Sequence, residues 1–425
     1  MVEKSRYWSP TRTYEFEVKI GKLDLTPDLY KISILSSIEV PYQTVILDMF
    51  LDPSDVIVEK LYGQEPISLN IRFIGTVAED FSLERISMEL LPITTEIDVP
   101  MYDKLGPPLQ TTGYKERKPF TVTAVARYPY KVMNTIVNDV FFGRDLYTAI
   151  NHLVSTYVTN TTLNYDTNDR NTEVLDQILV PPTTLYQAIK YLNRTIGIFN
   201  GIPAVYCSSN TTQPSKSILN IKNITKKITT SHRFTVWQLA TGANNEDIIK
   251  KSGDGTTYYT LLPLKTGYSG SSTFAAIAPT IKYIAKPKDT LFTQFDIDLE
   301  SFAGKYGIIS KSNEIFFDKQ DIDPKTRVLY SKDHSGNDQS QTYINANLSK
   351  SISELATVTI QLERSLMLFN LMEVGEAVQL NSKMSSVTNL TGKYILKAST
   401  LDFVKARDWE SMARIYLVRT NKTIN

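Results

Sequence analysis

Alternation of apolar and polar residues at both ends of the chain is the feature that most limits its fold. In the first 127 residues, strand-like segments lie at residues 14–20, 32–40, 44–51, 67–73, 86–90 and 120–126. A period of two is typical of strands with one buried and one solvated face, as in antiparallel sheets. The first block therefore predicts an antiparallel barrel or sandwich of about six strands, with a long loop at residues 92–118.

The same pattern returns toward the C-terminus. Strand-like segments lie at residues 217–224, 233–240, 256–264 and 291–299, and again at residues 356–363, 374–380, 392–398 and 409–419. Residues 301–350 are rich in Asp, Lys, Asn and Ser, which is typical of an exposed insertion. The sequence thus predicts a second β-block made of residues 216–300 and 351–425. No sequence repeat relates it to the first block.

The pattern between the two blocks changes to a helical period. Apolar residues recur at helical spacing in residues 145–158, behind Asp145 as an N-cap, and in residues 183–196, behind a threonine cap and before Gly197. The dipeptide Asn200-Gly201 between apolar runs predicts a tight hairpin. Residues 128–215 are therefore interpreted as a small α/β domain with two helices.

Length, charge and hydropathy exclude several classes of protein. A chain of 425 residues is long enough for several domains. Its 46 basic and 45 acidic residues give a net charge of +1, so the whole chain has no bulk attraction to nucleic acid or anionic membranes. The sequence has no apolar stretch long enough to span a membrane and no signal-peptide pattern at its start.

Side chains for catalysis or metal binding are scarce. The three histidines are His152, interpreted as a surface or satisfied helix residue, and His232 and His334, neither of which belongs to a metal or catalytic pattern. Hydrolase and nucleotide-binding motifs are absent. The glycine-rich residues 252–256 lack a lysine and a following helix, and residues 318–323 lack the bidentate glutamate of a calcium loop. We predict no catalytic residue, no cofactor and no metal ion.

The single cysteine, Cys207, ends an apolar strand pattern and is interpreted as a small buried side chain, not as a nucleophile. It cannot form a disulfide within the chain, so folding depends on burial alone, as in a reducing cytoplasm. The 24 tyrosines suit strand interiors and wide protein interfaces, because tyrosine combines a large apolar area with a polar tip. The composition favours assembly over catalysis.

Four segments, one in the middle of the chain and three near its C-terminus, resemble a known family. Residues 178–205, which begin Ile178-Leu179-Val180-Pro181-Pro182, resemble a stretch of bacteriophage tail-hub proteins, where an apolar-lined helix precedes a β-hairpin that closes a small α/β domain. Residues 371–380, 392–397 and 409–417 resemble the closing barrel strands of the same family. The chain is therefore similar to the baseplate hub proteins of contractile-tailed phages, which carry the central spike.

This resemblance implies a fold and a role. It implies two tube-like antiparallel β-barrels, at residues 1–127 and at residues 216–300 plus 351–425, separated by the α/β domain, with residues 301–350 inserted in the second barrel. It further implies a homotrimer in the virion tail, assembled in the host cytoplasm. One face would meet the sixfold tail tube or its terminal adaptor, the other would meet the threefold spike, and wedge proteins would lie at the periphery.

The resemblance also implies that phage DNA passes through the hub during ejection without specific binding. A strongly basic wall would hold the phosphate backbone, so we expect a neutral or acidic lumen. The similar hubs of bacterial contractile injection systems are usually continuous with their spike. This sequence ends at Asn425, soon after its last strand pattern, which favours a virion component with a separate spike chain; the hub of a bacterial contractile injection system stays open as an alternative.

Two other functions stay open at this level. A glycan hydrolase of the tail would need two carboxylates about 5 to 10 Å apart in an open cleft, and spacing along the sequence cannot exclude such a pair. A carbohydrate- or receptor-binding protein would need a surface lined by Trp or Tyr. Trp237 and Trp409 lie in strand patterns and Trp8 lies near the terminus, so few tryptophans are available to line such a surface.

Overall fold

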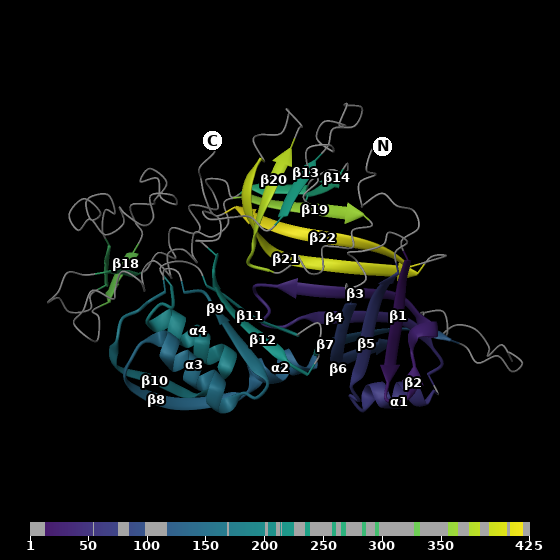
Figure 1. Ribbon diagram of the computed structural model, residues 1–425, viewed down its shortest axis with the longest axis horizontal. Helices are drawn as coiled ribbons and strands as arrows, with labels where there is room; N and C mark the ends of the chain where they lie inside the picture. The colour runs from purple at the N-terminus through teal and green to yellow at the C-terminus, as the bar shows by residue number, and fades with distance from the viewer. Residues whose placement is uncertain are drawn as a thin grey trace, which may run out of the picture.

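The computed structural model consists of two β-blocks and a small α/β unit (Figure 1). It describes residues 13–53, 55–74, 85–97, 117–167, 170–199, 203–209, 213, 215–224, 234–238, 257–260, 265–268, 283–285, 294–296, 327–331, 356–363, 374–382, 391–405 and 409–419. All structural statements below concern these residues.

The first β-block is an antiparallel sheet with the strand order β2-β1-β5-β6-β7-β4-β3. Its strands are β1 (Thr13–Ile20), β2 (Leu23–Asp24), β3 (Leu29–Ser37), β4 (Thr44–Leu51), β5 (Ile67–Ile74), β6 (Arg85–Ile97) and β7 (Lys118–Ala126). A short 3-10 helix, η1 (Thr26–Asp28), follows β2. Alternate residues of these strands are buried, as the period of two predicts.

Two features of this block differ from the prediction. Strand β6 continues to Ile97, so part of the segment expected as a loop from residue 92 is strand. A helix that was not predicted, α1 (Val56–Tyr62), begins after Asp55, whose side chain accepts a hydrogen bond from the Ile57 amide. Its seven residues are too few to show a helical period, so only the N-cap residue Asp55 could have indicated this helix.

The small α/β unit contains three helices, one more than predicted. They are α2 (Arg127–Asn134), which was not predicted, α3 (Leu146–Tyr157) and α4 (Leu185–Thr195). Asp145 and Thr184 cap α3 and α4 through hydrogen bonds from the amides of Thr148 and Gln187, which confirms both predicted helices. Their apolar faces pack in one core with a ribbon of β8 (Ile136–Arg144) and β10 (Leu175–Thr184), and with a three-stranded sheet, β11-β12-β9. The strands of that sheet are β9 (Thr161–Tyr165), β11 (Pro203–Ser209) and β12 (Ser217–Asn223).

Two expectations for this unit are wrong. The strand after Asn200-Gly201, β11, pairs with β12 and not with the residues before the dipeptide, and Phe199 bridges Arg170 instead. The second concerns the boundary near residue 215. Strand β12, which was assigned to the second β-block, pairs with β11 and β9, so the α/β unit extends to about residue 224. Periodicity identifies a strand but not its partner, because the partner is set by tertiary packing.

The second β-block has the strand order β14-β13-β20-β21-β22-β19-β15. Its strands are β13 (Phe234–Gln238), β14 (Thr257–Thr260), β15 (Lys265–Tyr268), β19 (Ala356–Glu363), β20 (Ala377–Ser382), β21 (Gly392–Lys405) and β22 (Trp409–Arg419). A separate sheet is formed by β16 (Tyr283–Ala285), β18 (Arg327–Ser331) and β17 (Gln294–Asp296). Apart from β18, the predicted insertion at residues 301–350 lies outside the described residues.

The two blocks repeat one topology. In chain order, β1, β2, β3, β4, β5, β6 and β7 take the same places in the first sheet as β13, β14, β15, β19, β20, β21 and β22 in the second. Each sheet has six pairs of neighbouring strands, and each pair in one sheet has a counterpart in the other. Four of these six pairs are antiparallel in both sheets. The exceptions involve β13, which pairs parallel with β20 and β14, whereas β1 pairs antiparallel with β5 and β2. The chain therefore contains two related β-modules that no sequence repeat reveals.

The fold is β-rich, as predicted, but the described ladders do not close into barrels. In the first block no described ladder joins β1 or β2 to β3. In the second, none joins β14 to β15. Barrel closure of either block stays a prediction. None of the helices in the described part of the chain is long and apolar enough to cross a membrane.

Candidate functional site: the face of the joined sheet

A single strand pair joins the two β-blocks. Strand β3 pairs antiparallel with β21, from Lys31 opposite Val404 to Ser37 opposite Ala398. Both blocks thereby belong to one continuous sheet, and Figure 1 shows β3 and β21 side by side where the purple and yellow strands meet. We call the eight strands β6-β7-β4-β3-β21-β22-β19-β15 the joined sheet.

A β-bulge at Lys397 makes this junction. On one edge of β21, residues before the bulge pair with β20, and residues after it pair with β3. The Ile38 amide donates to the Lys397 carbonyl at 3.0 Å, and the Lys397 Nζ lies 3.0 Å from Glu39 Oε1. A bulge bends a strand and increases its twist, so β21 can leave one neighbour and take another.

One hydrophobic core underlies the joined sheet. Phe403 of β21 is 1% exposed, and its ring packs edge-on against Tyr14 and Phe16 of β1, with centroids 5.0 and 5.2 Å away. The Phe16 ring in turn lies 4.2 Å from that of Trp409. Buried residues of both blocks belong to a single cluster. The relative position of the two blocks is therefore fixed by side-chain packing as well as by backbone hydrogen bonds.

The opposite side of the joined sheet is polar, and we call it the joined face. Its residues point away from the core on the central strands: Thr121 and Thr123 of β7; Thr44, Ile46 and Asp48 of β4; Lys31, Ser33 and Leu35 of β3; Thr400, Asp402 and Val404 of β21; and Met412, Arg414 and Tyr416 of β22. Two acidic and two basic residues balance one another, and hydroxyl groups are the commonest polar groups.

The two carboxylates of this face accept hydrogen bonds from hydroxyl groups of neighbouring strands. The Thr121 hydroxyl donates to Asp48 at 2.8 Å, and the Ser33 hydroxyl donates to Asp402 across the junction at 2.5 Å. The Lys31 Nζ lies 3.9 Å from Asp48 Oδ2. Both carboxylates of this set have a partner on a neighbouring strand, and the named residues of the central strands carry no net charge.

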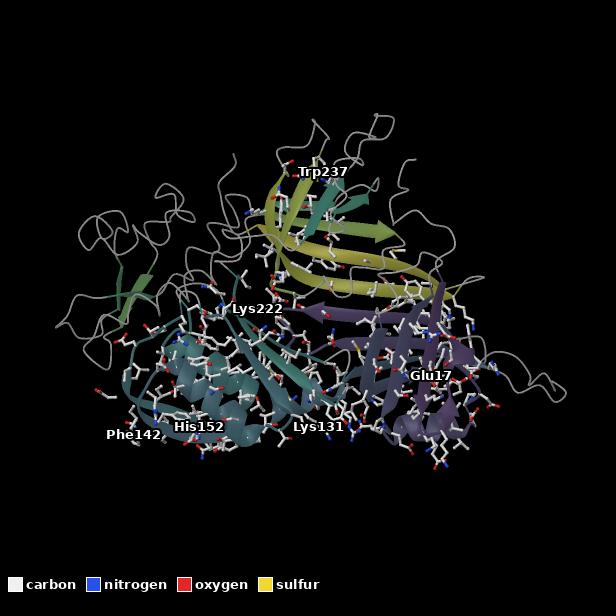
Figure 2. All side chains as sticks on the ribbon, viewed as in Figure 1. Glu17, Lys131, Phe142, His152, Lys222 and Trp237 are labelled. Carbon is white, nitrogen blue, oxygen red and sulfur yellow. The ribbon has the colours of Figure 1, made fainter. Side chains whose placement is uncertain are left out.

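The α/β unit is tied to the second block beside this sheet. The Lys222 Nζ lies 2.6 Å from Glu376 Oε1, with the two side chains 5% and 14% exposed. Tyr206 and Ile224 of the α/β unit pack there against Val374 and Ile395. Figure 2 shows Lys222 between the α/β unit and the second block. A largely buried ion pair within an apolar contact favours one orientation, since separating the two charges loses their mutual attraction at a site with little water.

The residues singled out for chemistry do not form a reactive site. His152 is half exposed on α3, 3.3 Å from Asp139 and edge-on to Phe141. Cys207 is buried, and burial raises the pKa of its thiol to about 12. No group of side chains suited to hold a metal ion occurs in the described residues. His232, His334, residues 252–256 and residues 318–323 lie outside them.

Sequence reasoning did not identify the joined face. Its residues are the polar half of the alternating pattern, so their exposure could be predicted strand by strand. Asp402 and Ser33, for example, are 369 positions apart. Nothing in the sequence says that β21 would pair with β3, because edge pairing between distant strands follows from the shape of both modules.

Comparisons with known proteins agree with this fold. Residues 114–259 match the family model described as Bacteriophage PBS1 gene 109 protein. No curated protein matches the chain. A tail protein from Neisseria meningitidis MC58 aligns over 96% of this chain and 97% of its own, with a TM-score of 0.54 and 11% identity. The 43 kDa tail protein of prophage MuSo2 from Shewanella oneidensis aligns over 96% and 99%, with a TM-score of 0.52 and 12% identity.

Both solved structures span nearly the whole chain, so the likeness includes the two β-blocks and the unit between them. At 11% and 12% identity, what these proteins share with this chain is the fold. The predicted resemblance to phage tail proteins is confirmed: the chain has the fold of these tail proteins, and its middle segment matches a phage protein family.

Proposed function

We propose that this protein is a structural component of a phage tail baseplate, and that three copies form a hub around the tail axis. The observation that carries the proposal is the repeated strand order of the two β-blocks within one chain. Three chains with two related modules each supply six similar units. Such a ring can match a sixfold tube on one face and a threefold spike on the other.

The partners follow from this symmetry. The tail tube protein or a tube-terminal adaptor binds one face of the ring, the central spike binds the other, and wedge proteins contact the outside. The protein works in the virion tail and assembles in the cytoplasm of the host. In this proposal each block behaves as a tube-like unit whose sheet faces the axis.

The joined face supports a role as the wall of the DNA channel. Its central strands offer hydroxyl groups and balanced charges, with Asp48 and Asp402 offset by Lys31 and Arg414. DNA carries a dense negative charge, and a wall of lysine and arginine would retain it through counterion release. A neutral wall lets DNA pass without specific binding.

The mass of the purified protein in native conditions tests the proposal. We expect an assembly of three times the 48.1 kDa chain, with a central hole in electron micrographs. A monomer at micromolar concentration would contradict the trimeric hub. The proposal also treats the chain as a structural part and not as an enzyme, so cleavage of purified cell-wall or capsule glycans by the protein would overturn that point.

A further inference from the structure

We propose that neighbouring copies join edge to edge, with β15 of one protomer pairing with the C-terminal half of β6 of the next, residues 93–97. This interface would copy, between chains, the β3–β21 pair that exists within each chain. The inference rests on the proposed trimer and adds the strands and the register through which it closes.

Matching features in the two modules align β6 with β21. Each strand pairs with its following strand, β7 or β22, and each has one bulge in that ladder, at Ile93 in β6 and at Lys397 in β21. With the bulges superposed, the buried Leu90 and Pro92 take the places of the buried Tyr394 and Leu396.

Burial in the neighbouring strands supports the same alignment. The aligned pairs are Val122 with Ile415, Val125 with Val418, Ile67 with Val378, Leu69 with Leu380, and Leu47 with Ile360. Both members of every pair are buried. A slip of one residue would reverse the face of each side chain, so burial excludes it, and the superposed bulges exclude a slip of two.

In this alignment two strand edges have no pairing strand within the described chain, although the matching edges of the other module are paired. Residues 85–90 of β6 pair with β5, as the start of β21 pairs with β20, but in the described structure residues 91–97 pair only with β7. The corresponding part of β21 pairs with β3. The strand that matches β3 in the second block is β15, which among the described strands pairs only with β19.

These two edges are the opposite ends of the joined sheet, since its strand order begins with β6 and ends with β15. An unpaired strand edge exposes backbone donors and acceptors that another strand can satisfy. Pairing the β15 edge of one chain with the β6 edge of the next produces a head-to-tail contact, and three such contacts can close a ring. The ring would then contain six similar junctions, three within chains and three between them.

The register of the β3–β21 pair predicts the register of the proposed β15–β6 pair. Within the chain, Leu35 of β3 lies opposite Thr400 of β21. In the repeat alignment, Gly267 takes the place of Leu35 and Glu96 takes the place of Thr400. We therefore expect Glu96 of one protomer to lie opposite Gly267 of its neighbour in an antiparallel pair. Glu96 is exposed, so that edge is accessible in the single chain.

Cysteine cross-linking tests this register. Directly opposed residues in antiparallel strands have Cα atoms about 4.5 to 5.5 Å apart, which a disulfide can span. The full-length variant with Glu96→Cys and Gly267→Cys is oxidised and run on a denaturing, non-reducing gel. The matched control is the variant with Leu35→Cys and Thr400→Cys, which should form its bond within one chain. The native Cys207 is 1% exposed and should not compete.

We expect covalent dimers and trimers from the first variant, and cross-linked monomers from the control. A variant with Glu17→Cys in place of Glu96→Cys, on the exposed face of β1, should give neither (Figure 2). Native mass measured before oxidation separates the two hypotheses. Trimers that do not cross-link at this register would overturn the interface and leave the hub, whereas a monomer that does not cross-link would overturn both.

Discussion

Replacing Phe403 with alanine should destabilise both β-blocks together. The side chain is 1% exposed and belongs to β21, yet its ring packs on Tyr14 and Phe16 of the first block. Loss of a buried phenylalanine costs about 3 to 5 kcal/mol, because burial is lost and a cavity remains. The two edge-on ring contacts place the expected loss toward the upper part of that range.

Guanidinium unfolding measures this loss in the free energy of unfolding. Trp409, whose ring lies 4.2 Å from that of Phe16, reports on the shared core by fluorescence in a background with Trp8→Phe and Trp237→Phe, and circular dichroism reports on the strands of both blocks. The matched control is Val404→Thr, which keeps the shape of the next side chain along the strand. Val404 is 41% exposed, so the control should change stability by less than about 0.5 kcal/mol. Both variants are compared at one protein concentration, since assembly also stabilises the fold.

Two results would refute the reasoning. A loss below about 1 kcal/mol would mean that the Phe403 ring is not part of a close-packed core. Separate transitions, with one block unfolding while the other stays folded, would mean that the blocks do not share a core. Coincident transitions at lower denaturant concentration would agree with the single cluster of buried residues.

Three further predictions concern the α/β unit and its attachment. Lys222→Ala should cost about 3 kcal/mol or more in thermal or denaturant unfolding because it removes the ammonium group that faces the largely buried Glu376 carboxylate, whereas the pair Lys222→Met with Glu376→Gln should recover most of the loss. Asp145→Ala should cost about 1 kcal/mol by removing the cap of α3, and Asp145→Asn should cost less; equal losses would refute the capping role. Burial raises the pKa of the Cys207 thiol from 9.0 to about 12, so ionisation favours the unfolded chain and stability should fall as the pH rises from 9.0 toward 12. Cys207→Ala should flatten that fall, and rapid labelling of the native thiol at neutral pH by a thiol reagent would show that Cys207 is not buried.

Many of the strands and helices could be predicted from local sequence patterns. The alternation in residues 14–20 and 120–126 predicted strands with one buried face, and β1 and β7 have it. Helices α3 and α4 could be predicted because an N-cap and a complete apolar stripe lie within one short segment. Two helices were not predicted, α1 and α2, because their seven and eight residues are too few to show a helical period.

Which strands pair with one another was harder to predict from the sequence. The sequence did not assign β12 to the α/β unit, did not show that β11 would pair with β12, and did not reveal the pairing of β21 with β3. The two β-modules have the same strand order but no recognisable sequence repeat, because many apolar side chains satisfy the same buried position. For the same reason, the resemblance to tail proteins was carried by the order of the elements more than by particular residues.

By itself, the sequence determined which residues form strands and helices, which side of each strand is buried, and that the chain lacks the motifs of common enzymes. Tertiary structure alone decided that Asp48, Lys31 and Asp402 share one polar face, and that this face crosses from one module to the other. The physical reason is that strand period and helix capping act over a few residues, whereas edge pairing depends on the shape and twist of whole modules.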